Sequence, residues 1–181
     1  MSPLSESAQS ELLTLCRNSL QEFLRQGRKR IKESTSPELL ERRGVFVTLH
    51  KHGELRGCIG VPEPVSPLFQ VAQECAVSAA ASDPRFAPVT EVELPDVKLE
   101  ISVLSSLEAT DHIDSIVIGE HGLLLNHQGR RGLLLPQVPV EHDWDREMFL
   151  EQLCRKAHLP ATAWKEGAKI QRFSAFVFGE K

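Results

Sequence analysis

The architecture follows from one stretch of the sequence, Val45-Phe-Val-Thr-Leu-His-Lys-His-Gly-Glu-Leu-Arg-Gly-Cys-Ile-Gly-Val61. Its first part, Val45 to Leu49, is rich in β-branched and aromatic residues, which is typical of a strand. Lys51-His-Gly-Glu54 then predicts a tight turn, from which the chain returns through Leu55 to Val61. The stretch therefore predicts a β-hairpin.

Helical patterns stand on both sides of this hairpin. Apolar residues recur at three- and four-residue steps from Leu4 to about Lys32, as they do along one face of a helix. A second helix is predicted from about Ser66 to Ser82, because Pro67 suits a first turn, where a missing N–H costs nothing.

Further elements are predicted in the second half of the chain. They are a strand from Val97 to Leu104, a hairpin over 121–136, a loop over 139–143, a helix from Trp144 to Ala157 and a buried strand from Phe173 to Phe178. No linker is long enough to separate two domains. The pattern predicts one α+β domain over residues 1–181, in which residues 1–9 form a loosely ordered extension.

Composition limits the possible functions. The chain has 21 Lys and Arg against 25 Asp and Glu, a net charge of −4, and 41% hydrophobic residues. This ordinary globular composition disfavours nucleic-acid binding, and the basic run over 25–32 is interpreted as a solvated helix end. No apolar stretch approaches the roughly 20 residues that cross a bilayer, and the start has no secretion signal. The four scattered cysteines are expected to be reduced thiols in the cytoplasm.

The densest chemical signal is Leu55-Arg-Gly-Cys-Ile-Gly60. Cys58 is a candidate nucleophile, because Arg56 would share its strand face and is able to lower the pKa of its thiol. Gly57 and Gly60 allow unusual backbone conformations or a close approach to a ligand. The alternative is a buried, packed cysteine with glycines that serve a bulge.

Other candidate residues are dispersed. His121 is the candidate acid/base partner of Cys58, and Arg85 is a candidate for pairing with a carboxylate across a cleft. His50 and His52 are two residues apart, but the spacings typical of metal sites are missing, as are phosphate and dinucleotide motifs. The sequence predicts no metal and no cofactor.

The same hexapeptide resembles the signature motif of the AMMECR domain family. The similarity continues in the same order through Asp83-Pro-Arg-Phe86, Glu100-Ile-Ser-Val-Leu104, His121-Gly122 and Leu135-Pro-Gln-Val138. The resemblance implies a compact two-lobed α+β fold, mostly antiparallel sheet backed by helices, with the hexapeptide near the junction. It also implies an AmmeMemoRadiSam system protein A, whose partners are Memo-like and radical S-adenosylmethionine proteins.

Two functions stay open at this point. In the first, the protein is a binding component with a ligand or partner site at Leu55–Gly60, formed by Arg56, Gly57, Gly60 and Arg85. This predicts a buried, inert Cys58 and an exposed apolar patch. In the second, the protein is an enzyme in which Cys58 attacks or binds a small anionic substrate, with His121 as acid/base group. The binding component is favoured, because Cys58 has no tight catalytic constellation around it in the sequence.

Overall fold

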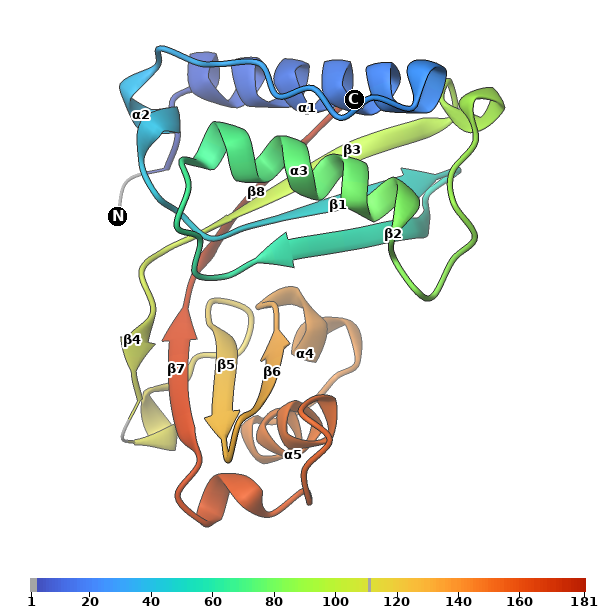
Figure 1. Cartoon of the computed structure of the whole chain (residues 1–181). Coiled ribbons are helices and arrows are strands. Elements are labelled where there is room, and N and C mark those ends of the chain that lie inside the picture. The colour runs from blue at the N-terminus through green and yellow to red at the C-terminus, as the bar shows by residue number, and fades with distance from the viewer. Residues whose placement is uncertain (1–2, 111) are drawn as a thin grey trace. The chain divides into compact units, whose positions relative to one another are not determined.

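The computed structural model describes residues 3–110 and 112–181, which form two compact units (Figure 1). Unit 1 comprises the chain up to Leu104 together with Phe176–Lys181, and unit 2 is Ser105–Ala175. Each unit contains a four-stranded sheet. The predicted α+β class with two lobes is confirmed. That residues 1–181 form one domain stays a prediction.

The sheet of unit 1 has the strand order β2-β1-β3-β8. The predicted hairpin is confirmed as β1 (Val45–Lys51) and β2 (Glu54–Val61), joined by a turn in which His52 and Gly53 have positive φ. The strand β3 (Val97–Leu104) pairs antiparallel with the other side of β1, and β8 (Ala175–Gly179) completes the sheet. The hexapeptide therefore lies on an edge strand.

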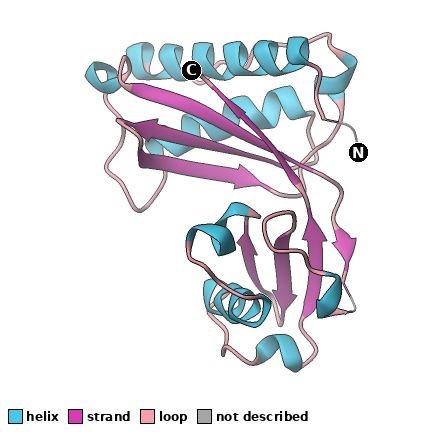
Figure 2. Cartoon of the chain, turned by 180° about the vertical axis from the view of Figure 1, so that it is seen from behind, coloured by secondary structure: helices cyan, strands magenta, loops and turns pink. Residues whose placement is uncertain are grey.

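Helices cover one face of this sheet. Both α1 (Glu6–Gln26) and α3 (Leu68–Ala81) pack against it, and the short α2 (Pro37–Leu40) lies beside them. Figures 1 and 2, from opposite sides, show α1 and α3 on the same side of the strands. Val45, Val47 and Leu49 of β1 are fully buried in this core. The alternate residues Phe46, Thr48 and His50 therefore point to the opposite face of the sheet. We call it the open face because neither α1 nor α3 covers it.

The beginning and end of α1 differ from the sequence pattern. The helix stops at Gln26 because Gly27, with φ of 67°, donates its N–H to the Phe23 carbonyl and turns the chain left-handed. Most of the basic run thus lies beyond the helix, not at its end. Residues 1 and 2 of the expected loose extension are outside the described part, but Leu4 and Ala8 are buried in the core.

The sheet of unit 2 has the order β4-β7-β5-β6. Its strands are β4 (Glu108–Ala109), β5 (Gly122–His127), β6 (Arg130–Leu134) and β7 (Lys169–Phe173). The helix α5 (Arg146–Lys156) buries Phe149, Leu150, Leu153 and Cys154 in a core that includes Leu123 and Leu125 of β5. The predicted hairpin over 121–136 and the helix after Trp144 are confirmed.

Two expectations for unit 2 and for the strand that leads out of it are wrong. Residues 139–141 of the predicted loop over 139–143 belong instead to the helix α4 (Gln137–Glu141). The helix tolerates Pro139 because the N–H groups of a first turn have no helical partner. The predicted strand from Phe173 to Phe178 is interrupted at Ser174, which separates β7 from β8. Short 3-10 turns complete the chain at Glu91–Glu93, Ile113–Ser115 and Ala163–Lys165.

Among the described residues, no helix is both long enough and apolar enough to pass through a bilayer.

Candidate functional site

The free edge of β2 is covered by the segment that follows α3. The backbone N–H of Cys58 donates to Asp83 Oδ2 over 2.8 Å, so a carboxylate replaces the missing neighbouring strand at the centre of the hexapeptide. An edge N–H would otherwise be open to water or to another chain. Asp83 therefore fixes both the position of the motif and the path of the chain after α3.

The two motif glycines lie on opposite faces of β2, and each has a packing reason. Gly57 pairs with Leu49 on the helix face, where an added Cβ would lie 2.2 Å from the carbonyl oxygen of Ala79 in α3. Gly60 pairs with Phe46, and a Cβ there would lie 2.3 Å from the Phe46 ring. Gly57 lets a helix approach and Gly60 makes room for an aromatic ring. Their predicted role in ligand binding stays a prediction.

Asp83 holds the guanidinium of Arg85 in a two-point ion pair. Arg85 Nε donates to Oδ1 over 3.0 Å and Nη2 donates to Oδ2 over 2.7 Å, while the Arg85 backbone N–H also donates to Oδ1. The Asp83 side chain is 2% exposed, whereas that of Arg85 is 51% exposed and lies over the Phe86 ring. Hydrogen bonds from Arg85 hold the pKa of Asp83 well below its usual range.

Arg56 is occupied by a different segment. Its Nε and Nη2 donate to the two carboxylate oxygens of Glu93 over 3.0 and 3.1 Å, and its Nη1 donates to the Ala87 carbonyl over 2.9 Å. Lys51 donates to the same carboxylate. These bonds, with Arg56 first, hold the pKa of Glu93 well below its usual range. Arg56 thus clamps the chain between α3 and β3 onto the hairpin.

The thiol of Cys58 is partly exposed. The Thr48 hydroxyl donates to Sγ over 3.3 Å. Burial is the largest influence and raises the pKa of the Cys58 thiol, while Thr48 and the charge of Arg85 oppose the rise. The expectation that Arg56 lowers this pKa is wrong. The pairing of β1 with β2 shifts between Leu49 and His50, which breaks the alternation at Arg56, and the guanidinium that acts on the thiol is that of Arg85.

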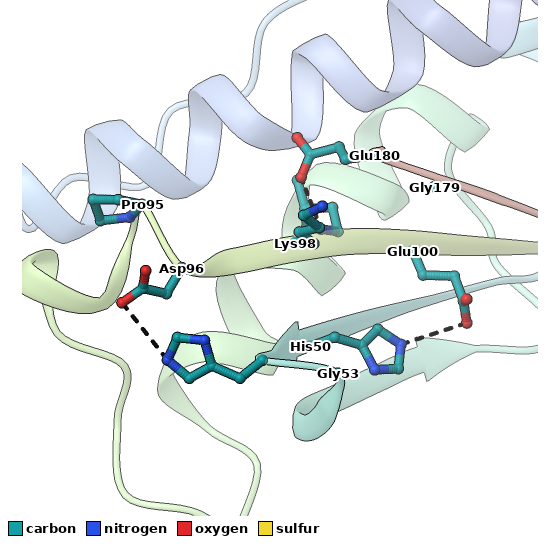
Figure 3. Close-up of a pocket in the computed structure, with 10 residues that line it drawn as sticks. His50, Gly53, Pro95, Asp96, Lys98, Glu100, Gly179 and Glu180 are labelled. Carbon is teal, nitrogen blue, oxygen red and sulfur yellow. Dashed lines mark hydrogen bonds and ion pairs between the residues drawn. The ribbon is translucent and has the colours of Figure 1, made fainter.

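Cys58 starts a polar row that crosses the open face of unit 1. Thr48 pairs with Cys58 on one side and with Glu100 of β3 on the other. Glu100 Oε1 in turn lies 3.7 Å from His50 Nε2. The row runs from β2 across β1 to β3 and ends at a pocket of about 620 Å³, drawn in Figure 3. Sequence reasoning missed Thr48 and Glu100 and considered His50 only for metal binding, although strand alternation puts Thr48 and His50 on one face.

His121 belongs to unit 2, whereas Cys58 belongs to unit 1. The Nδ1 atom of His121 accepts the backbone N–H of Val117 over 3.0 Å, so one ring nitrogen is used within its own turn. Its role as an acid/base partner of Cys58 stays a prediction. Within residues 3–110 and 112–181, no three His, Cys, Asp or Glu side chains are grouped so that they could hold a metal ion.

Comparison with known proteins identifies the family. The family model described as AMMECR1 matches residues 13–178, almost the whole chain. The chain belongs to the AMMECR1 family. Sequences similar to this chain include a protein of Methanocaldococcus jannaschii, 47% identical over 163 residues that cover 85% of this chain and 81% of that protein. Another, from Thermococcus onnurineus, is 44% identical over 182 residues that cover 94% and 89%.

A solved structure has the same fold as this chain. The crystal structure of an uncharacterized protein from Pyrococcus horikoshii is 38% identical and has a TM-score of 0.92, covering 98% of this chain and 94% of that one. The resemblance based on the hexapeptide and the blocks that follow it is thereby confirmed at the level of family and fold.

Proposed function

We propose that this AMMECR1-family protein is a binding component of an AmmeMemoRadiSam-type system, with its ligand or partner site on the open face of unit 1 at Leu55–Gly60. The observation that carries the proposal is the state of Cys58. Its thiol is hydrogen-bonded to a hydroxyl, and burial raises its pKa, so the motif presents a fixed polar surface in place of an ionised nucleophile.

Arg85 is the side chain best suited to contact a partner. Two of its five N–H donors are held by a buried carboxylate, which leaves the others on a half-exposed side chain of fixed orientation. A guanidinium that is already ordered loses little entropy on binding, and arginine is among the residues that dominate binding energy at interfaces. The family resemblance supplies the class of partner, namely Memo-like and radical S-adenosylmethionine proteins.

The first test measures binding of each of these two partner proteins by biolayer interferometry. Arg85→Gln is expected to weaken the affinity of the true partner about tenfold or more, as is typical of an anchoring arginine. Arg28→Gln, at an exposed position of the basic run, is the matched control and should leave affinity unchanged. Urea unfolding of both variants shows that the fold is intact. Equal affinities for Arg85→Gln and the unchanged protein would contradict the proposal.

The enzyme hypothesis remains the second candidate because Cys58 is partly exposed and because Thr48 and Arg85 both favour the thiolate. The two functions differ in the pH dependence of alkylation by iodoacetamide. As a binding component, Cys58 should react slowly at pH 6 to 7, and its rate should rise about tenfold per pH unit towards a pKa above the usual value of about 8.5.

Thr48→Val should slow this alkylation further, because it removes a hydrogen bond that lowers the pKa of the Cys58 thiol. Cys58→Ser should abolish the labelling seen before unfolding, since the other three cysteines are buried. Rapid labelling of Cys58 at pH 6 would instead favour the nucleophile.

A further inference from the structure

The pocket at the end of the polar row is a separate feature of unit 1. Its volume of about 620 Å³ lies within the range of roughly 300–1,000 Å³ that ligand pockets usually have. It is lined by residues from β1, the β1–β2 turn, the start of β3 and the end of β8. Figure 3 shows its charged side chains, none of which belongs to the hexapeptide.

Three charged residues that alternate in sign along the chain line this pocket. Lys98 and Glu100 of β3 are two residues apart, so they project from the same face of the strand about 6 to 7 Å from each other, and Asp96 lies in the turn immediately before β3. Lys98 lies between the two carboxylates in Figure 3. The order of charges along the chain is therefore negative, positive, negative.

An imidazole stands beside each carboxylate. His50 Nε2 lies 3.7 Å from Glu100 Oε1, and His52 Nε2 lies 4.0 Å from Asp96 Oδ2. The Nε2 atom of His50 is buried and has no hydrogen-bond partner in the described part of the chain. Both distances exceed those of a good hydrogen bond, so neither imidazole satisfies the carboxylate beside it, and the carboxylate oxygens stay open to another cation.

The remaining acid of the pocket is already paired. Glu180 accepts hydrogen bonds from Arg17 and from the backbone N–H of Leu99. The charges left for a ligand are two carboxylates and one ammonium, and their sum is negative. A neutral molecule would leave this net negative charge without a counterpart, and a simple anion would add to it.

We propose that this pocket binds a small basic zwitterion of the basic amino acid class. The carboxylate of the ligand pairs with Lys98, and its two cationic groups pair with Asp96 and Glu100, which matches each fixed charge with its opposite. The proposal does not depend on Cys58 or on a protein partner, and it goes beyond the binding function proposed above.

The test uses L-arginine as the probe and agmatine, which lacks only the carboxylate, as the matched ligand. Binding is followed by NMR through the backbone amides of Gly53 and Gly179, which line the pocket. We expect saturable binding of L-arginine and about fivefold weaker binding of agmatine, as partly exposed ion pairs contribute modestly.

Variants assign each charge. Asp96→Asn and Glu100→Gln should each weaken both ligands about fivefold, while Lys98→Met should weaken L-arginine and spare or tighten agmatine. Glu74→Gln, at an exposed position of α3 outside the pocket, should change neither affinity. These side chains are exposed or partly exposed, and thermal unfolding confirms that each variant folds.

Three outcomes would overturn the proposal. The first is the absence of saturable binding up to about 10 mM. The second is an equal loss of affinity in Glu74→Gln, which would show non-specific attraction. The third is agmatine binding as tightly as L-arginine to the unchanged protein, which would remove the role of Lys98.

Discussion

Replacing Gly57 by alanine is expected to destabilise the protein by about 3 kcal/mol, because the added methyl group has no space. Its Cβ would lie 2.2 Å from the carbonyl oxygen of Ala79. That oxygen belongs to the backbone of α3, so it cannot rotate away as a side chain would. The strand β2 and the helix α3 must separate instead. Urea unfolding followed by circular dichroism measures the loss.

Gly27→Ala is the matched control for this substitution. No heavy atom lies within 4 Å of a Cβ built at Gly27, so only its left-handed backbone, with φ of 67°, opposes a side chain. That conformation costs about 1 kcal/mol. Equal losses in the two variants would show that the close approach of α3 to β2 contributes nothing to the need for Gly57.

Asp83→Asn is expected to cost about 3 kcal/mol at pH 7. The buried carboxylate accepts hydrogen bonds from the Cys58 N–H, the Arg85 N–H and the Arg85 guanidinium. A neutral amide offers only one acceptor oxygen, so at least one buried donor and the guanidinium charge lose their partner. Urea unfolding at pH 7 measures this loss as well.

The same variant carries a pH signature. The pKa of Asp83 is lowered in the folded protein, so the stability it supplies is present above its unfolded pKa of about 3.9 and is lost as the pH falls towards the folded value. The difference between the unchanged protein and Asp83→Asn should therefore be constant above about pH 5 and shrink below pH 4.

Asp114→Asn serves as the control for this pH dependence, because the Asp114 side chain is 91% exposed even though it pairs with Arg146. Its effect on stability should be small at every pH. A difference for Asp83→Asn that stays constant down to pH 2 would contradict the assigned role of the carboxylate.

Local patterns predicted the elements whose signals are local. The β1–β2 hairpin follows from strand-forming residues on either side of a Lys-His-Gly-Glu turn, and β3 follows from its alternation. The end of α1 was misplaced although its signal was present, since Gly27 stands inside the basic run. The helix α4 was missed because Pro139 was taken as a loop residue, whereas a first helical turn accepts proline.

The candidate site was predictable only in part. The hexapeptide identified β2 and Cys58, but the groups that govern the thiol come from β1, β3 and the segment after α3. Proximity in sequence suggested Arg56 as the neighbour of the thiol, and the irregular pairing at that point defeated the inference. Arg85 lies 27 positions after Cys58 in the chain, but its guanidinium acts on the Cys58 Sγ because Asp83 holds it near the thiol.

The position of β8 has a consequence for biosynthesis. Unit 1 contributes the first strands to leave the ribosome, yet its sheet needs β8, of which Phe176–Gly179 are translated after every residue of unit 2. During translation, the edge of β3 that pairs with β8 therefore stays unpaired until all residues of unit 2 have been made. The half of the protein that begins first is finished last, and until β8 is made β3 keeps an unpaired edge of the kind along which strands mispair.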